Sequence, residues 1–182
     1  MTIETTPFKD LLVIHNPVFS DHRGVFQESF NEARFRIETG LNVTFVQDNE
    51  SVSALHVLRG LHFQIPPASQ AKLVRVSRGR VRDVVVDLRR SQPTYGQHFS
   101  IELSADNHTQ MYVPEGMAHG FYVLEPDTIF SYKCTRYYHA EYDRVLKYND
   151  PALGIDWGPG PFVLSEKDLA APLLNQLDHV FI

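Results

Sequence analysis

The sequence predicts an all-β protein, a sandwich or barrel of short strands with a few short helices at its periphery. Runs of β-branched and aromatic residues recur at short intervals, turn residues separate them, and only two segments carry helical signals. No linker, repeat or low-complexity segment divides the 182 residues, a length that suits one core. We therefore expect a single β domain over residues 1–182.

The expected strands are short and recur along the chain: residues 11–18, 43–47, 72–76, 81–88, 99–103, 110–113 and 128–135. In the fourth of these, the alternation of side chains places Val84 and Val86 on one face, which is expected to be core. Asp83 and Asp87 lie on the opposite, mixed face. A mixed face suits either solvent or the lining of a barrel that holds a polar ligand.

Two helices are expected, over residues 31–39, with Gly40 as the stop, and over residues 165–170. Ser165 and Asp168 match a capping box, in which the serine is the cap and the acidic residue is its partner. On these residues alone, helix capping is the favoured role of Asp168.

The composition excludes several classes of protein. The formal net charge is −5 and no long basic run occurs, so nucleic acid is not an expected partner. No apolar run approaches the roughly 18 residues of a membrane span, and no signal segment opens the chain, which predicts a cytoplasmic protein. Cys134 is the only cysteine, which excludes an intrachain disulfide and a cysteine zinc cluster.

The densest group of chemically active side chains lies in residues 58–64. If this run is a strand, Gly60, His62 and Gln64 share a face, and His62 projects into a pocket beside an amide. Histidine suits proton transfer, but a histidine that is only hydrogen-bonded inside a β core fits the same pattern. The segment alone leaves both roles open.

The run Pro114-Glu115-Gly116-Met117-Ala118-His119 resembles the second sequence motif of the cupins, which are small jelly-roll β-barrels. This resemblance implies a cupin barrel. Many cupins bind a metal through a first motif that supplies two histidines and a glutamate, but here Gln64 and Lys72 stand in that region. A cation in place of a carboxylate ligand repels a divalent ion, so no metal site is expected.

A third group occupies residues 130–138, a run rich in tyrosine. Tyr132 is either a core aromatic of a strand or, if it faces the pocket, a phenol that donates a proton. Tyr138 lies six residues further on and would share its side if the strand stays regular, a placement that suits stacking on a nucleobase.

Together these runs resemble the 3,5-epimerase family of dTDP-rhamnose synthesis, often called the RmlC-like cupins. The segments that match occur in the family's order: residues 19–28, 45–51, 58–64, 72–76, 83–89, 114–121, 132–138 and 164–168. The resemblance implies a cofactor-independent enzyme that epimerises a dTDP-linked 4-keto-6-deoxy hexose at C3 and C5.

The resemblance also assigns the catalytic roles. His62 is the general base, Asp168 orients and charges it, and Tyr132 is the acid on the opposite face of the sugar. Lys72 and Arg59 supply positive charge near the 4-oxygen, where negative charge develops as the proton leaves. Under the resemblance, Asp168 becomes a site residue first and a helix cap second.

Substrate binding and assembly follow from the same resemblance. The expected binding residues are Arg23, Phe26, Glu28, Gln47, Asn49, Arg59, Lys72, His119, Tyr138 and Lys167, with Tyr138 stacked on thymine. Residues 23–28 reach the neighbouring subunit, which implies a homodimer, although a surface ion pair would also account for Arg23 and Glu28. Asp143 stands where many family members carry glutamate, so no contact is assigned to it.

Three alternatives remain from the sequence. The chain could invert only C3 or only C5, it could be a sugar-nucleotide-binding module without activity, or it could be a metal-dependent cupin. The joint presence of His62, Tyr132 and Asp168 favours an enzyme, because binding alone requires no acid and base on opposite faces.

Overall fold

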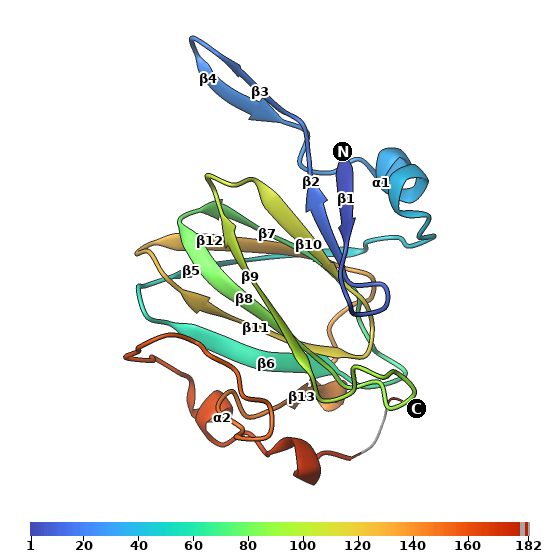
Figure 1. The fold of residues 1–182 in the computed structure, drawn as a ribbon, viewed down its shortest axis with the longest axis vertical. Helices are drawn as coiled ribbons and strands as arrows, with labels where there is room; N and C mark the ends of the chain where they lie inside the picture. Colours follow the sequence, from blue (N-terminus) through green and yellow to red (C-terminus); the bar gives the residue numbers. More distant parts are fainter. Residues whose placement is uncertain (179–180, 182) are drawn as a thin grey trace.

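A computed structural model describes residues 1–178 and 181 of the chain. Two antiparallel sheets face each other and form a flattened barrel (Figure 1). The six-stranded sheet has, in spatial order, β1 (Thr2–Thr5), β2 (Leu12–His15), β10 (Thr109–Val113), β7 (Lys72–Arg78), β12 (Thr128–Cys134) and β5 (Gln47–Ser53). The five-stranded sheet has β13 (Asp143–Val145), β6 (Leu58–Gln64), β11 (Met117–Val123), β8 (Arg80–Asp87) and β9 (His98–Ser104). The predicted all-β barrel is confirmed.

A separate hairpin and four short helical segments complete the described fold. The hairpin, β3 (Val18–Asp21) and β4 (Gly24–Gln27), projects away from the barrel at the top of Figure 1. The α-helices are α1 (Glu32–Thr39) and α2 (Glu166–Leu169), and the 3-10 turns are Ala140–Tyr142 and Leu174–Gln176. None of these helices is long and apolar enough to cross a lipid bilayer.

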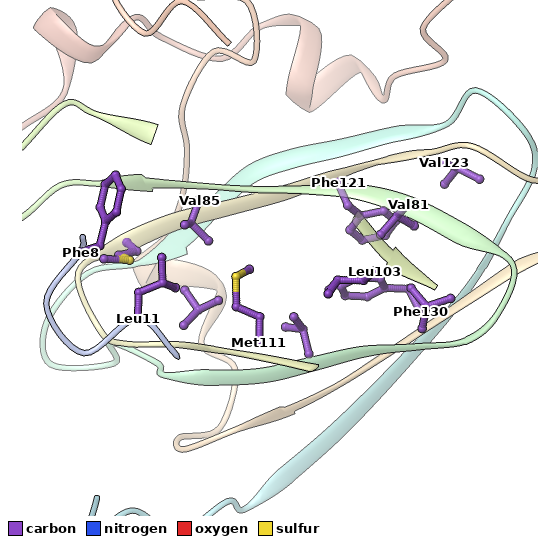
Figure 2. Packing of buried hydrophobic residues seen from close by; sticks show 13 residues of the cluster. Phe8, Leu11, Val81, Val85, Leu103, Met111, Phe121, Val123 and Phe130 are labelled. Atoms are coloured by element: carbon purple, nitrogen blue, oxygen red, sulfur yellow. The ribbon is translucent and has the colours of Figure 1, made fainter. Parts of the chain in front are cut away.

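The main core fills the space between the two sheets (Figure 2). Phe121 and Phe130 come from opposite sheets and stack with their ring centroids 4.0 Å apart. Leu11 and Met111 continue this core toward the other end of the barrel, and both are fully buried. Burial of such side chains is worth roughly 1.5–3 kcal/mol each, so this layer holds the two sheets together.

The two faces of β8 are both buried, for different reasons. Val84 and Val86 point outward into a second cluster, in which Trp157 and Leu146 of the C-terminal segment cover the five-stranded sheet. Val85 points inward into the main core. Asp83 is also buried, with 0% of its surface exposed, so the mixed face of this strand lines the barrel interior.

The two predicted α-helices are present and capped. Asn31 accepts a hydrogen bond from the backbone N–H of Arg34 and starts α1, and Gly40 ends it with φ of 70°. Phe35 of α1 packs against the outer face of the six-stranded sheet. Ser165 accepts from the backbone N–H of Asp168 and starts α2, as the capping box predicts.

Two predicted strands are wrong in part. Residues 43–46 form no strand, because Val43 and Phe45 pack on the cluster around α1 instead of joining a ladder, and β5 begins at Gln47. The strand predicted over residues 11–18 ends at His15. The strand ends before Asn16-Pro17, because proline has no N–H to donate to a strand ladder.

Candidate active site

A cavity of about 310 Å³ lies inside the barrel between the two sheets. One wall comes from β6 and β11 of the five-stranded sheet, and the opposite wall comes from β5, β7 and β12 of the six-stranded sheet. Its lining residues are Asn49, Glu50, Ser51, Arg59, His62, Lys72, His119, Gly120, Phe121, Phe130 and Tyr132. The cavity therefore brings together seven of the predicted site residues, from segments distant in the sequence: Asn49, Arg59, His62, Lys72, His119, Tyr132 and, through His62, Asp168.

His62 and Asp168 form a close pair at this cavity. The His62 Nε2 and Asp168 Oδ1 atoms are 2.6 Å apart, and the carboxylate is buried whereas 36% of the histidine side chain is exposed. Burial raises the pKa of Asp168, but hydrogen bonds from His62 and Ser165 and the charge of Lys167 outweigh it and hold the pKa below its usual value. A carboxylate accepts from Nε2–H, which leaves the lone pair of Nδ1 free to act as a base.

Tyr132 and Lys72 lie on the opposite wall, on the paired strands β12 and β7. The Lys72 Nζ atom lies 5.6 Å from the centroid of the Tyr132 ring. Burial raises the pKa of Tyr132, which keeps the phenol protonated and able to donate. Burial lowers the pKa of Lys72, and the nearby carboxylates of Asp143 and Asp83 oppose that effect.

Three polar residues beside the cavity are held by local hydrogen bonds. Arg59 Nε donates to Ser53 Oγ at 3.1 Å, and Gln47 Nε2 donates to Asn49 Oδ1 at 3.0 Å. Gln47 accepts in turn from the backbone N–H of Tyr138. These hydrogen bonds hold the three side chains in place.

His119 stands directly opposite His62 in the antiparallel pairing of β11 with β6. The two strands approach closely at Gly60 and Gly120, where a Cβ atom built on Gly60 would lie 2.6 Å from the Gly120 Cα. His119 is buried and contacts Asp83, with Nε2 2.9 Å from Oδ1. The glycine pair thus allows two histidine–carboxylate pairs to lie on neighbouring strands.

A second polar group forms outside the cavity lining, around Asp143. Its Oδ2 atom accepts from the Tyr138 hydroxyl at 3.1 Å and from the ammonium of Lys167. Sequence reasoning assigned no contact to Asp143; the signal that could have found it is its position between the tyrosine-rich run and Lys167. β12 ends at Cys134, so the regular strand that would place Tyr138 on the side of Tyr132 does not reach residue 138.

Several predicted residues lie elsewhere in this chain. Arg23 and Phe26 are exposed on the hairpin, and Arg23 pairs with Asp21 at 2.5 Å. Glu28 pairs with Arg34 at 3.0 Å. Within one chain, Arg23 and Glu28 therefore have local partners, and neither lies at the cavity.

Gln64 is not among the residues that line the cavity, although β6 pairs regularly with β13 from His62 to Gln64. It is buried, its Oε1 atom accepts from the backbone N–H of His139, and its Nε2 atom donates to the carbonyl of Ala68. The pairing of β6 with β11 shifts register between His119 and Phe121, which stand opposite His62 and Arg59, so the alternation assumed in the prediction is interrupted at Gly60 and not between His62 and Gln64. Residues 1–178 and 181 contain no group of three or more His, Cys, Asp or Glu residues placed to hold a metal ion.

Comparison with known proteins identifies the family. The family model described as dTDP-4-dehydrorhamnose 3,5-epimerase matches residues 5–176. The enzyme of that name from Salmonella typhimurium is 47% identical over 180 residues, covering 97% of each chain. The chain belongs to the dTDP-4-dehydrorhamnose 3,5-epimerase family.

Solved structures of this epimerase family share the fold. The dTDP-6-deoxy-D-glucose-3,5-epimerase of Legionella pneumophila, in complex with dTDP-4-keto-L-rhamnose, superposes with a TM-score of 0.93 at 47% identity, covering 97% of this chain and 94% of that one. A 3'-monoepimerase of Streptomyces bikiniensis in complex with dTDP-quinovose has a TM-score of 0.89 at 32% identity, covering 93% of this chain and 86% of that one. Both 3,5-epimerases and a mono-epimerase therefore use this barrel.

Proposed function

We propose that the chain epimerises dTDP-4-keto-6-deoxyglucose at C3 and C5, with His62 as the base and Tyr132 as the acid. The observation that carries this proposal is the placement of the two side chains on opposite walls of one cavity. Inversion at a carbon requires a proton to leave from one face and return from the other. Two proton carriers that face each other across a sugar-sized space meet that requirement.

The chemistry begins at a hydrogen that the 4-keto group makes acidic. His62 Nδ1 removes the proton from C3 or C5, and the ionised Asp168 stabilises the imidazolium that forms. The electrons of the broken C–H bond move to the 4-oxygen as an enolate, which Lys72 and Arg59 stabilise electrostatically. The Tyr132 hydroxyl then returns a proton to the opposite face of the same carbon and is left as a phenolate. His62 releases its proton to solvent and Tyr132 takes one up from solvent, after which the cycle repeats at the second carbon.

The nucleotide part of the substrate binds outside the space between His62 and Tyr132. Arg59 and Lys167 are the cations suited to the diphosphate, and the exposed ring of Tyr138 is suited to stacking on thymine. Binding of the diphosphate would draw Lys167 away from Asp143.

The assembly that we propose is a homodimer in which the hairpin of each subunit completes the site of its neighbour. The hairpin exposes three large apolar side chains, with 61% of the surface of Phe19, 59% of that of Val25 and 68% of that of Phe26 open to solvent. Soluble monomers rarely expose apolar side chains in such a group. Arg23 and Glu28, which lie at or next to the hairpin, would then meet the substrate of the partner.

The decisive experiment is incubation with dTDP-4-keto-6-deoxyglucose in D₂O. The expected result is deuterium at both C3 and C5 with both centres inverted, as measured by NMR of the sugar. Deuterium at only one carbon would show that the chain is a mono-epimerase. Tight binding with no deuterium at either carbon would contradict an enzymatic role.

A further inference from the structure

The inward face of β8 contributes a second histidine–carboxylate pair that the proton transfers do not use. Asp83 is fully buried, and both of its oxygens contact His119 Nε2, at 2.9 and 3.0 Å. His119 lines the cavity and faces His62 across the strand pairing. The pair is therefore next to the reacting groups without being one of them.

Packing alone gives no account of this pair. Two of its neighbours are apolar: Val85 is the next inward-facing residue of β8, and the ring of Phe130 lies 5.9 Å from that of His119. Lys72 is near enough that the charge of Asp83 opposes the lowering of the Lys72 pKa by burial. Moving a carboxylate out of water is costly, and an apolar pair of similar volume would stabilise such a core at least as well. A buried carboxylate that is kept beside a cavity by a histidine indicates a role in the site.

The contact also determines which nitrogen of His119 faces a ligand. A carboxylate only accepts hydrogen bonds, so Nε2 carries the proton that Asp83 receives. In the described part of the chain, Nδ1 has no hydrogen-bond partner and is not among the polar atoms buried without one. Nδ1 is therefore open to the cavity, with a lone pair that accepts a hydrogen bond.

We propose that Asp83 is a positioning residue, which fixes His119 so that Nδ1 holds a hydroxyl of the sugar ring against His62. This inference rests on the proposed function and deepens it, because it assigns the binding and orientation of the sugar ring to a residue pair distinct from the base and the acid. The nucleotide end of the substrate, near Tyr138 and Lys167, lies outside this contact.

The test compares Asp83→Asn, His119→Asn and the double variant with the wild-type protein. We expect kcat to fall about 10- to 100-fold in each single variant, the scale for loss of one charge-assisted hydrogen bond. The Kd for dTDP, measured by calorimetry, should stay within about twofold, since dTDP lacks the sugar. The double variant should be no slower than His119→Asn, because residues that act through one another are not additive.

A spectroscopic measurement separates positioning from simple support of the fold. Nitrogen-15 NMR of the histidine rings should place the proton of His119 on Nε2 in the wild-type protein. In Asp83→Asn the amide can donate to Nε2, so the proton should shift toward Nδ1. The variant His119→Asn assigns the signal.

Asp87→Asn is the matched control, because Asp87 lies on the same face of β8, is equally buried, and is held by Arg89 and Thr94 away from the cavity. It should lower the melting temperature and leave kcat near the wild-type value. Asp83→Asn with unchanged kcat, or a double variant whose losses multiply, would overturn the inference. A wild-type chain that exchanges no deuterium would overturn the proposed function instead, whereas the position of the His119 proton is measured independently.

Discussion

At the scale of the residue, Asp168 has two partners at once. Its Oδ1 atom contacts His62, and its Oδ2 atom accepts from the Ser165 hydroxyl at 2.8 Å. Helix capping and orientation of the base are therefore joint roles of one buried carboxylate, although sequence reasoning treated them as alternatives. The short helix holds the carboxylate in the position where it meets the imidazole.

His62→Ala should lose nearly all turnover and keep its affinity for dTDP. Removal of a general base typically slows a reaction about 10²- to 10⁴-fold, whereas the groups proposed to bind the nucleotide are untouched. Turnover is measured by product formation and affinity by calorimetry. Retention of more than a tenth of wild-type turnover would contradict the role of His62.

Tyr132→Phe should separate the rate of deuterium incorporation from the rate of epimerisation. Without the phenol, protonated His62 can still return a deuteron to the original face, which exchanges hydrogen without inverting carbon. We expect epimerised product to fall much further than deuterium incorporation, with both followed in one reaction. If Tyr132 is only a core aromatic, phenylalanine fills nearly the same volume and both rates stay together.

Activity should survive dialysis against a strong chelator. Among the described residues that line the cavity, His62 and His119 supply two imidazoles, and Lys72 adds a positive charge between the same walls. Such a set is a poor site for a divalent ion. Metal analysis of the dialysed protein accompanies the assay, and activity that is lost with a stoichiometric metal and restored by it would refute the expectation.

At the scale of the element, α2 has four residues and depends on its cap. Ser165→Ala should lower the free energy of unfolding by about 0.5–2 kcal/mol and should also slow turnover severalfold, because Asp168 loses one of its two partners. Chemical denaturation and steady-state kinetics measure the two effects. Ser165→Thr, which keeps the hydroxyl, is the control and should restore both; a stability loss without any change in turnover would mean that the cap does not orient Asp168.

Elements whose composition matches their structure could be predicted from the sequence. The valine-rich run of β8 and the capped helix α1 are confirmed, because burial and capping leave clear local patterns. In contrast, β5 has the sequence Gln-Asp-Asn-Glu-Ser-Val-Ser, which has low strand propensity, and it forms by pairing along its whole length with β12. Tertiary context decides such a strand.

The candidate site divides in the same way. His62, Tyr132 and Lys72 could be named because residue types and family resemblance marked them, and their catalytic roles remain predictions. The pairing of His119 with Asp83 and the position of Asp143 could not be predicted. Both depend on contacts between segments more than 20 residues apart in the sequence, and the position of Asp143 depends also on where β12 ends. Pairing across a barrel leaves no local signal.

At the scale of the whole molecule, the projecting hairpin supports a test of shared sites. Arg23→Ala/Glu28→Ala should be inactive because each site lacks groups from its neighbour, and His62→Ala should be inactive because each site lacks its base. After the two variants are mixed and allowed to exchange subunits, about a quarter of wild-type activity should return, since random dimers regain one complete site in half of the pairs.

The controls for this mixture are each variant put through the same exchange alone, which should stay inactive. Sedimentation reports whether dimers form in every sample. Mixed dimers without any recovered activity would contradict the sharing of sites, and a monomeric wild-type protein would contradict the assembly itself.

The C-terminal segment that covers the outer face of the five-stranded sheet also delivers Asp168 to His62. Hydrogen bonds to the barrel hold this segment in place, such as the backbone N–H of Leu58 donating to the carbonyl of Val163 and Arg82 Nη1 donating to the carbonyl of Asp156. A layer outside the strand ladders opens locally at a lower free energy than the sheets that it covers. Catalytic competence is thus tied to a layer outside the two sheets, so mild denaturant should abolish activity while the barrel is still folded.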